Sequence, residues 1–543
     1  MGRHPLLSIT FFLAAQTGCS VWSGELWYPD EVRHASILQN LLRSDQWLLL
    51  QMHGTFYVDK PPVYFWFQAV LARLFGTDGP PIFFLSVALS GLLFLFSTYA
   101  MARRIGGMGR PGSLLCALLL LTNCYFVDRC HMPRMDLMFG AFMNLGAVCL
   151  FMGWSRPGFQ LWTVAGFALA ALATLTKGPL GLIFPVLAGV AWLVWQKRAR
   201  RLWNWDGVLG FALALLMVGA WVWSCSRIAG PGLLHEIFVN QIFHRAVNSP
   251  MFKEPLFYYC VLLPVVGLPW TPVIFFLPLR SWTRRSYWVG AWMRRGDAGG
   301  GPVFLWCLVL GIFLVLTCMS YKLSIYLVYL FAPLMVLTGR ALERMNPASL
   351  RRLVVSLAGL FLFMALSVPW IKYIYPQPQS RYLHGLVLVA VCAGLLAAAL
   401  FRLRTRPVGQ IIVVMVTGLT LASLPLYLIT RPGQDPAFSP KAIGAEFRQY
   451  LGQGYAPVTY RIHHYRAGTL DYYFGQDLPE AETEEDFLRL LASHPKLVML
   501  TDGSFWGQWT NRPPSLKMVS HHFFGWGSWV IATQDGPAPL PPK

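Results

Sequence analysis

Two short polar runs stand out near the N-terminus of a chain that is otherwise strongly apolar. The first covers residues 28–34 (YPDEVRH), and the second covers residues 56–62 (FYVDKPP). A carboxylate can take or hold a proton, and a lysine or arginine can bind an anion. Ionisable groups close to membrane-spanning segments are costly, so groups of this kind indicate a functional site. We therefore place the candidate chemistry between the first two apolar segments.

The surrounding chain has the composition of a protein that crosses a membrane many times. Of its 543 residues, 55% are hydrophobic and 13% are charged, about half the charged fraction of soluble domains. Uninterrupted apolar runs predict about thirteen transmembrane helices. These runs lie near residues 6–24, 82–101, 112–127, 137–153, 160–176, 178–196, 208–226, 256–278, 303–318, 323–339, 353–374, 384–401 and 410–429. The fold expected is a polytopic α-helical membrane protein.

The distribution of charge predicts how the helices are oriented. Clusters of Lys and Arg fall in every second loop, as in loops that stay in the cytoplasm. Only three of the 24 acidic residues, Asp206, Asp297 and Glu343, fall in those loops. The net charge of +20 is therefore read as a signal for topology and not as a nucleic-acid footprint. We expect the candidate chemistry to face the outer side of the membrane.

Two segments on the outer side are too long to be simple connections. Within the first outer loop, residues 25–81, two amphipathic stretches (32–42 and 62–75) predict helices lying in the membrane interface. Residues 1–24 also fit a cleaved signal peptide, which would leave the orientation of the rest unchanged. We assign residues 1–430 to a transmembrane domain.

Residues 431–543 have the composition of a soluble domain. A helix is expected over 439–451, and strands over 457–462, 496–500 and 529–533. Thr483 begins a run that resembles a capping box before a further helix. A small outer-facing α/β domain is therefore predicted. The adjacent histidines 463/464 and 521/522 are expected on strands, where neighbouring side chains point to opposite faces, so neither pair predicts a metal site.

The order of motifs carries further information. The two first-loop runs are followed by RMD at 134–136, TKGP at 176–179, LPW at 268–270 and YKLxxY at 321–326. This order resembles the lipid A aminoarabinose transferase family. That family belongs to the polyprenyl-phosphate-sugar glycosyltransferases of the GT-C fold, which also include protein O-mannosyltransferases. The likeness covers nearly the whole chain. It implies transfer of a sugar from an undecaprenyl phosphate carrier to lipid A or another envelope glycolipid.

The resemblance implies a donor site that stabilises the departing carrier phosphate. Lys60 is the best candidate for this contact, with Arg245 in a later outer loop. Tyr57 and Tyr326 are candidates as neutral hydrogen-bond donors. The simpler alternative for Lys60 is an exposed ion pair with Asp59, which would contribute little energy.

The resemblance also implies an acceptor site with a carboxylate that orients or deprotonates the acceptor. Asp30 is the first candidate and Asp136 the second. Glu31 belongs to the same acidic run, and Arg33 is expected to hold a carboxylate or phosphate in place. Arg134 and Asp136 could instead form an interfacial pair.

A metal is the point at which the chain departs from the family. Family members place a Glu before the lysine and a His in a later outer loop, a pair that resembles a zinc site. Here Asp59 replaces the Glu, and Asn240 or Gln241 stands near the expected His, with His235 and His244 close by. Asp59 is thus the candidate ligand for a divalent metal (zinc, magnesium or manganese), and no cofactor is firmly predicted.

Other functions are compatible with parts of this pattern. A protein O-mannosyltransferase-like enzyme would have the same fold. A lipid-linked sugar flippase would be expected to carry polar groups at mid-membrane and repeated halves, whereas here the charges gather at one face and no repeat is found. We expect a monomeric glycosyltransferase whose partners are the lipid-linked donor, a lipid or glycan acceptor and membrane lipids.

Overall fold

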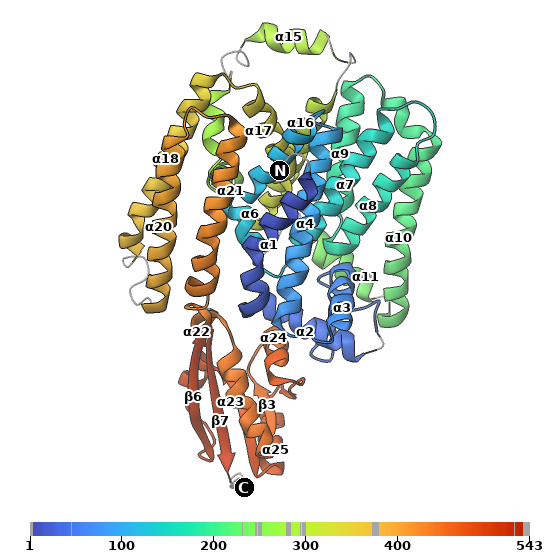
Figure 1. Ribbon diagram of the computed structural model, residues 1–543. Coiled ribbons are helices and arrows are strands. Elements are labelled where there is room, and N and C mark those ends of the chain that lie inside the picture. The colour runs from blue at the N-terminus through green and yellow to red at the C-terminus, as the bar shows by residue number, and fades with distance from the viewer. Residues whose placement is uncertain are drawn as a thin grey trace. The chain divides into compact units, whose positions relative to one another are not determined.

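The computed structural model describes residues 4–44, 46–230, 232–244, 247, 252–277, 284–293, 295, 300–371, 380–525 and 527–535. They divide into two compact units (Figure 1). The helical unit comprises Met1–Ser23, Val58–Phe67 and Phe83–Thr430, and the mixed unit comprises Gly24–Tyr57, Gln68–Ile82 and Arg431–Lys543. Each unit is built around its own apolar core.

Among the described residues, nine helices are long and apolar enough to cross a membrane. They are α1 (Pro5–Ser23), α4 (Pro80–Arg104), α7 (Asp136–Trp154), α10 (Trp205–Ala229), α16 (Gly301–Cys318), η4 with α17 (Ser324–Leu330 and Phe331–Glu343), α18 (Pro347–Ser367) with η5 (Val368–Trp370), α20 (Ser380–Arg402) and α21 (Val408–Pro425) with η6 (Leu426–Thr430). The chain is therefore a multi-pass membrane protein.

Three of the remaining predicted spans are shorter apolar helices: α5 (Arg110–Leu121), α8 (Leu161–Lys177) and α9 (Leu180–Trp195). A further short apolar helix, α3 (Val63–Phe75), corresponds to the stretch 62–75 that was expected to lie in the membrane interface. The span predicted over 256–278 is divided into α13 (Tyr258–Val266) and η3 (Thr271–Phe276), with Pro264 inside α13. Short segments complete the unit: α6 (Cys124–Arg129), η1 (Ala199–Trp203), α11 (Gly232–His235), η2 (Glu236–His244) and α15 (Arg285–Met293).

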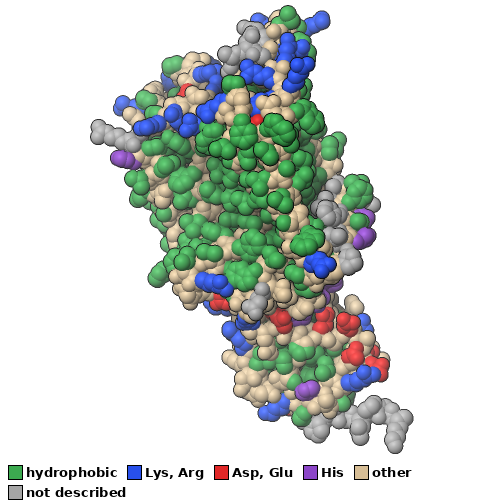
Figure 2. All heavy atoms as spheres, turned by 90° about the vertical axis from the view of Figure 1, so that its right-hand side faces the viewer, with side chains coloured by type: hydrophobic (Ala, Val, Ile, Leu, Met, Phe, Trp, Pro, Cys, Tyr) green, Lys and Arg blue, Asp and Glu red, His purple; other side chains and the backbone are tan. Residues whose placement is uncertain are grey.

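Small residues let the helices of the helical unit approach closely. A Cβ added to Gly146 in α7 would lie 3.1 Å from the backbone oxygen of Gly166 in α8, and one added to Gly166 would lie 2.8 Å from Leu150. Such contacts are characteristic of helices packed in a membrane. Figure 2 shows a broad hydrophobic band on this unit, with Lys and Arg side chains gathered at one end of it.

The mixed unit contains a five-stranded sheet with the strand order β4-β3-β5-β7-β6. β3 (Ala456–Tyr460) runs parallel to β4 (Glu480–Ala481) and β5 (Lys496–Asp502), whereas β7 (Gly527–Asp535) is antiparallel to β5 and to β6 (Leu516–Phe524). The strands expected over 457–462, 496–500 and 529–533 are thus present as β3, β5 and β7. The helices are α22 (Asp435–Phe438), α23 (Lys441–Gly452), α24 (His464–Phe474), α25 (Glu484–Ser493) and α26 (Gly503–Gln508).

Of two local sequence-based predictions in the mixed unit, one is confirmed and one is wrong. Thr483 is the N-cap of α25 and accepts a hydrogen bond from the Asp486 backbone N–H at 3.1 Å, as its sequence predicts. The strand expected to contain His463 and His464 ends earlier, because Arg461 has a positive φ of 57°. His463 instead caps α24, and His464 is its first residue. The prediction that these two histidines lie on a strand is therefore wrong.

Much of the first outer loop belongs to the mixed unit. α2 (Asp30–Arg43) packs against α24, and a hairpin of β1 (Gln51–Met52) and β2 (Thr55–Phe56) follows it. From the sequence, this loop was expected to belong to the transmembrane domain. In the structure, residues 24–57 and 68–82 group with residues 431–543 instead.

Candidate active site

The helical unit contains a buried carboxylate surrounded by polar groups. Asp136, which is only 2% exposed, accepts hydrogen bonds from the Lys177 ammonium and from the Tyr329 hydroxyl, the latter at 2.7 Å. The Arg134 Nε lies 3.6 Å from the second carboxylate oxygen. Lys177 also donates to the Tyr329 oxygen at 2.8 Å. A charge buried this deeply is stable only with such partners.

Helix ends place these three groups together. Asp136 is the first residue of α7, where the helix dipole favours a negative charge. Lys177 is the last residue of α8, which ends at Gly178 with a φ of 134°. Tyr329 comes from the 3-10 turn η4 (Ser324–Leu330). Two helix ends and a turn therefore meet at one point of the helical unit.

Further positive charge lies close to this cluster. The Lys177 ammonium is 4.9 Å from the centre of the Tyr326 ring, and Lys60 is near enough to repel Lys177. Lys60 itself donates to Asp59 at 2.9 Å, and both side chains are mostly buried. Together with Arg134, these residues contribute three cations against the carboxylates of Asp59 and Asp136. We refer to Lys60, Arg134 and Lys177 as the cation cluster.

The acidic run of the first loop lies in the mixed unit, at the start of α2. Asp30 is the first residue of α2 and accepts from the Arg33 guanidinium, and its side chain remains 28% exposed. Glu31 is buried instead and accepts from Arg431 at 3.2 Å through both oxygens. It also accepts from the Trp27 backbone N–H at 3.0 Å. The two neighbouring carboxylates therefore have different surroundings.

Trp27 and the segment that follows residue 430 are joined by further contacts. Arg431 lies 4.4 Å from the centre of the Trp27 ring, and the Trp27 indole donates to Asp435 at 2.8 Å. Burial raises the pKa of Asp435 above its usual range, although the Trp27 hydrogen bond acts in the opposite direction. Glu31 and Asp435 thus connect the start of α2 to the beginning of the C-terminal region.

Comparison with known proteins identifies the family. Residues 59–223 match a family model described as dolichyl-phosphate-mannose-protein mannosyltransferase. The chain is 30% identical, over 397 residues, to undecaprenyl phosphate-alpha-4-amino-4-deoxy-L-arabinose arabinosyl transferase 2 of Pseudomonas fluorescens strain Pf0-1. The aligned residues make up 71% of this chain and 68% of the relative. The chain belongs to this arabinosyl transferase family.

Other relatives support the same assignment. The arabinosyl transferase of Pseudomonas aeruginosa strain PAO1 is 28% identical over 422 residues, or 76% of this chain and 74% of the relative. The crystal structure of ArnT from Cupriavidus metallidurans bound to undecaprenyl phosphate superposes with a TM-score of 0.77 at 22% identity and covers 97% of both chains. The family resemblance is therefore confirmed, and the fold is of the GT-C type.

The structure groups the predicted site residues in part. Lys60, Asp136 and Tyr326 lie in the helical unit, the first two within the charged surroundings described above. Tyr57 is 2% exposed and belongs to the mixed unit, with its ring 6.2 Å from that of Tyr465. Arg245 lies outside the described residues.

Two residues of the candidate site were not named as site residues from the sequence. Lys177 was noted only as part of the TKGP motif, and Tyr329 was not singled out. Their signals are weak: Lys177 directly precedes Gly178-Pro179, and Tyr329 follows Tyr326 by three residues. Their place in the site is apparent only from the structure, in which Asp136 contacts each of them.

The metal that the resemblance implies at Asp59 stays a prediction. Asp59 Oδ2 is engaged by Lys60, and Asp59 belongs to none of the clusters of three potential ligands found among the described residues. The side chains of Asn240 and Gln241 lie outside the described part of the chain. We assign no chemical step to a metal at this position.

Proposed function

We propose that this protein transfers 4-amino-4-deoxy-L-arabinose from an undecaprenyl phosphate carrier to lipid A at the periplasmic face of the inner membrane. The observation that carries the proposal is family membership, established by 30% identity across more than two thirds of a named arabinosyl transferase. The apolar helices and the cation cluster of this protein are consistent with a lipid-linked, anionic donor.

The cation cluster is proposed to bind the carrier phosphate. In the reaction the bond between the anomeric carbon of the sugar and a phosphate oxygen breaks, and the carrier phosphate leaves with the electron pair. Lysine and arginine stabilise the charge that develops on that oxygen. Asp136 is then a positioning residue, because its carboxylate holds Lys177 and Tyr329 and is itself too buried to take up a proton from a bulky acceptor.

Asp30 is proposed to act on the acceptor. An oxygen of the acceptor forms the new bond to the anomeric carbon, and Asp30 orients that group or receives its proton. The partial exposure of Asp30 supports this role, and Arg33 keeps its carboxylate in one orientation. Glu31 has the supporting role of fixing the start of α2 through Arg431.

A reconstituted assay tests the function directly. The purified protein is placed in liposomes with undecaprenyl phosphate-linked aminoarabinose and lipid A, and the products are identified by mass spectrometry. We expect lipid A bearing the added sugar, together with free undecaprenyl phosphate. Absence of this product, together with consumption of a lipid-linked hexose supplied in a parallel reaction, would contradict the proposal.

A protein mannosyltransferase is the second candidate, because residues 59–223 match the model of that description. The same liposomes, supplied with a lipid-linked mannose and an acceptor peptide, distinguish the two. The arabinosyl transferase proposal expects no glycosylated peptide in this reaction.

A further inference from the structure

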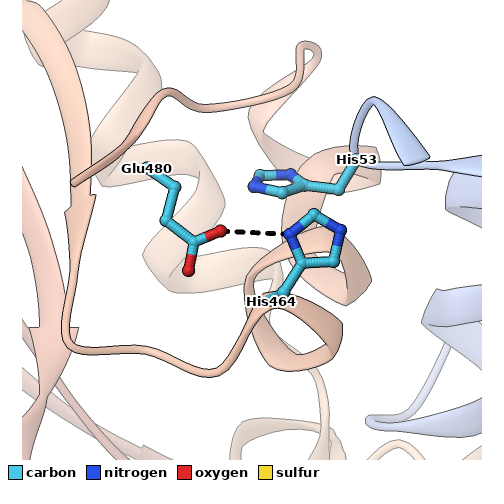
Figure 3. A group of neighbouring side chains, drawn as sticks. All are labelled: His53, His464 and Glu480. Carbon is cyan, nitrogen blue, oxygen red and sulfur yellow. Dashed lines mark hydrogen bonds and ion pairs between the residues drawn. The ribbon is translucent and has the colours of Figure 1, made fainter. Parts of the chain in front are cut away.

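Three potential metal ligands in the mixed unit come from segments that are far apart in the sequence. His53 lies at the tip of the β1–β2 hairpin, His464 begins α24, and Glu480 begins β4. One ligand atom of each lies within 4.8 Å of those of the other two. Figure 3 shows the three side chains converging.

The backbone holds His53 toward this point. His53 and Gly54 both have positive φ, 53° and 70°, which is the geometry of a tight two-residue hairpin turn. The hairpin tip rests on α24, where a Cβ on Gly468 would lie 2.7 Å from the Cβ of His53. The absence of a side chain at Gly468 therefore permits the close approach.

Hydrogen bonding fixes the tautomer of His53. Its Nδ1 lies 2.9 and 3.1 Å from the two oxygens of Asp471, so the proton resides on Nδ1 and Nε2 keeps its lone pair. A carboxylate that accepts from the far nitrogen is the usual outer partner of a metal-binding histidine. His53 is thus prepared to bind a cation through Nε2.

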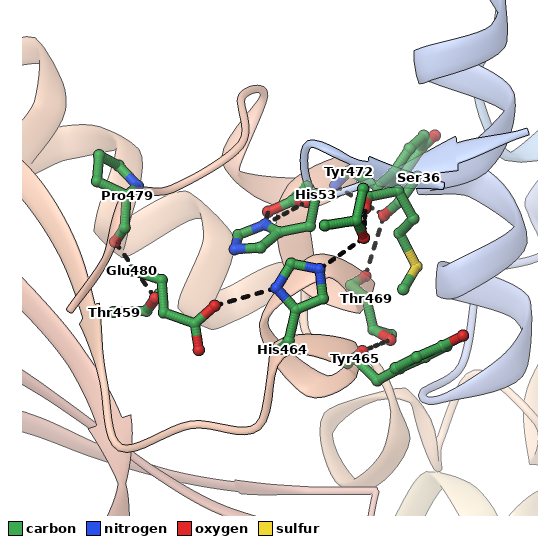
Figure 4. A network of polar contacts seen from close by, with 12 residues as sticks. Ser36, His53, Thr459, His464, Tyr465, Thr469, Tyr472, Pro479 and Glu480 are labelled. Carbon is green, nitrogen blue, oxygen red and sulfur yellow. Dashed lines mark hydrogen bonds and ion pairs between the residues drawn. The ribbon is translucent and has the colours of Figure 1, made fainter. Parts of the chain in front are cut away.

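His464 is held on both sides of its ring. The Thr55 hydroxyl donates its proton to the Met52 carbonyl at 3.1 Å, and its oxygen lies 2.8 Å from His464 Nε2. His464 Nδ1 lies 3.0 Å from Glu480 Oε2, so a proton joins these two atoms, and a metal ion bound there would take the place of that proton. Figure 4 shows the His464–Glu480 contact within the surrounding network of polar contacts.

Glu480 is held by the sheet. The carbonyl of the preceding residue, Pro479, accepts from the Thr459 backbone N–H at 2.8 Å, and Glu480 pairs with Thr459 across β3 and β4. Its carboxylate thus comes from a fixed strand. All three side chains line an open cavity of about 840 Å³, which leaves room for a fourth ligand such as water.

We propose that His53 Nε2, His464 Nδ1 and the Glu480 carboxylate bind a zinc ion that joins the first-loop hairpin to the C-terminal sheet. Two imidazoles and one carboxylate form a familiar zinc ligand set. Tetrahedral coordination places ligand atoms about 3.3 Å apart, and the present atoms lie within 4.8 Å of one another, so a bound ion would draw the side chains closer together. The alternative is an ion pair between His464 and Glu480 that binds no metal. The proposed ligands do not include Asp59, and the proposal does not rest on the proposed function.

Zinc stoichiometry of the full-length protein tests the proposal. The protein is purified in detergent, stripped with a chelator, incubated with zinc chloride and desalted, and its bound zinc is counted by atomic emission. We expect His464→Gln and Glu480→Gln to bind one zinc fewer per chain than the wild type. His463→Asn is the matched control, because it keeps the N-cap acceptor next to the site and should bind as much zinc as the wild type.

An outer-partner variant and a spectroscopic measurement complete the test. Asp471→Asn should weaken zinc binding about 10–100-fold. X-ray absorption of the zinc-loaded wild type should show two imidazole ligands, a result that requires no variant to fold. Equal zinc content in the wild type and in monodisperse Glu480→Gln, or a spectrum without imidazole ligands, would overturn the proposal.

Discussion

At the scale of single residues, Asp30 and Glu31 show how adjacent carboxylates take different roles. Glu31 is enclosed by Arg431 and Trp27, whereas Asp30 is more than a quarter exposed and held by Arg33. An exposed carboxylate can meet an acceptor, and an enclosed one supports the local fold. The two positions should therefore respond differently to loss of charge.

The first prediction concerns Asp30→Asn. The amide keeps the shape of the side chain but cannot accept a proton, so transfer to lipid A should fall at least ~10²-fold. The measurement is the initial rate in liposomes, with membrane insertion checked in parallel. Glu485→Gln, on the exposed face of α25, is the control and should leave the rate unchanged. Near-wild-type transfer by Asp30→Asn would remove this residue from the mechanism.

The second prediction concerns Lys60, which donates a hydrogen bond to Asp59. Lys60→Ala should abolish binding of undecaprenyl phosphate, and adding Asp59→Ala should not restore it, because the phosphate has lost its cation. Lys60→Arg should retain part of the affinity, since it keeps the charge in a different shape. Affinity is measured on purified protein, with the exposed Lys517→Ala as control. Unchanged affinity in Lys60→Ala would show that the pair with Asp59 is only structural.

The third prediction separates stability from binding at Asp136. Lys177→Met should destabilise the protein by about 3–5 kcal/mol, because it leaves the buried Asp136 carboxylate without its main partner. Adding Asp136→Asn should recover most of that stability but not the affinity for undecaprenyl phosphate. Thermal unfolding and lipid binding are measured on the same samples. Recovery of both in the double variant would mean that Lys177 serves the fold alone.

At the scale of elements, glycines determine how closely α7 and α8 pack. The fourth prediction is that Gly166→Val destabilises the helical unit by about 1–3 kcal/mol, the usual effect of overpacking, because its Cβ would lie 2.8 Å from Leu150. Gly219→Val in α10 is the control, since no atom lies within 4 Å of the added Cβ. The yield of monodisperse protein and its unfolding temperature are compared. Equal losses in the two variants would point to helix propensity and not to packing.

The secondary structure around residue 461 also explains why the prediction that His463 and His464 lie on a strand was wrong. Period-two alternation places His463 and His464 on opposite faces of a strand. The positive φ of Arg461 ends that strand, so His464 starts a helix and meets a hairpin from the first loop instead. A single backbone angle thus changes which residues His464 can contact.

At the scale of the whole molecule, the fifth prediction is the topology. Because basic residues cluster in alternate loops, we expect the C-terminus to be periplasmic and the loop after α9 to be cytoplasmic. Alkaline phosphatase fused after Lys543 should be active, and the same enzyme fused after Arg201 should be inactive. A green fluorescent protein at the same two positions should give the opposite pattern. Activity after Arg201 only would reverse the orientation of every helix.

The sequence by itself determined the features that depend on composition and short-range periodicity. Long apolar runs predicted a multi-pass membrane protein, Thr483 marked a helix start, and local strand signals located β3, β5 and β7. The order of motifs identified the family. Each of these signals lies within a few neighbouring residues, so no knowledge of packing is needed to read it.

The tertiary structure alone decided which distant residues meet. Asp136 contacts Tyr329 across 193 positions, Glu31 contacts Arg431 across 400, and His53 contacts Asp471 across 418. It also grouped most of the first loop with the C-terminal region. Helix propensity and hydrophobic pattern specify elements but not their partners. A buried charge becomes interpretable only when the packing of the chain shows which group compensates it.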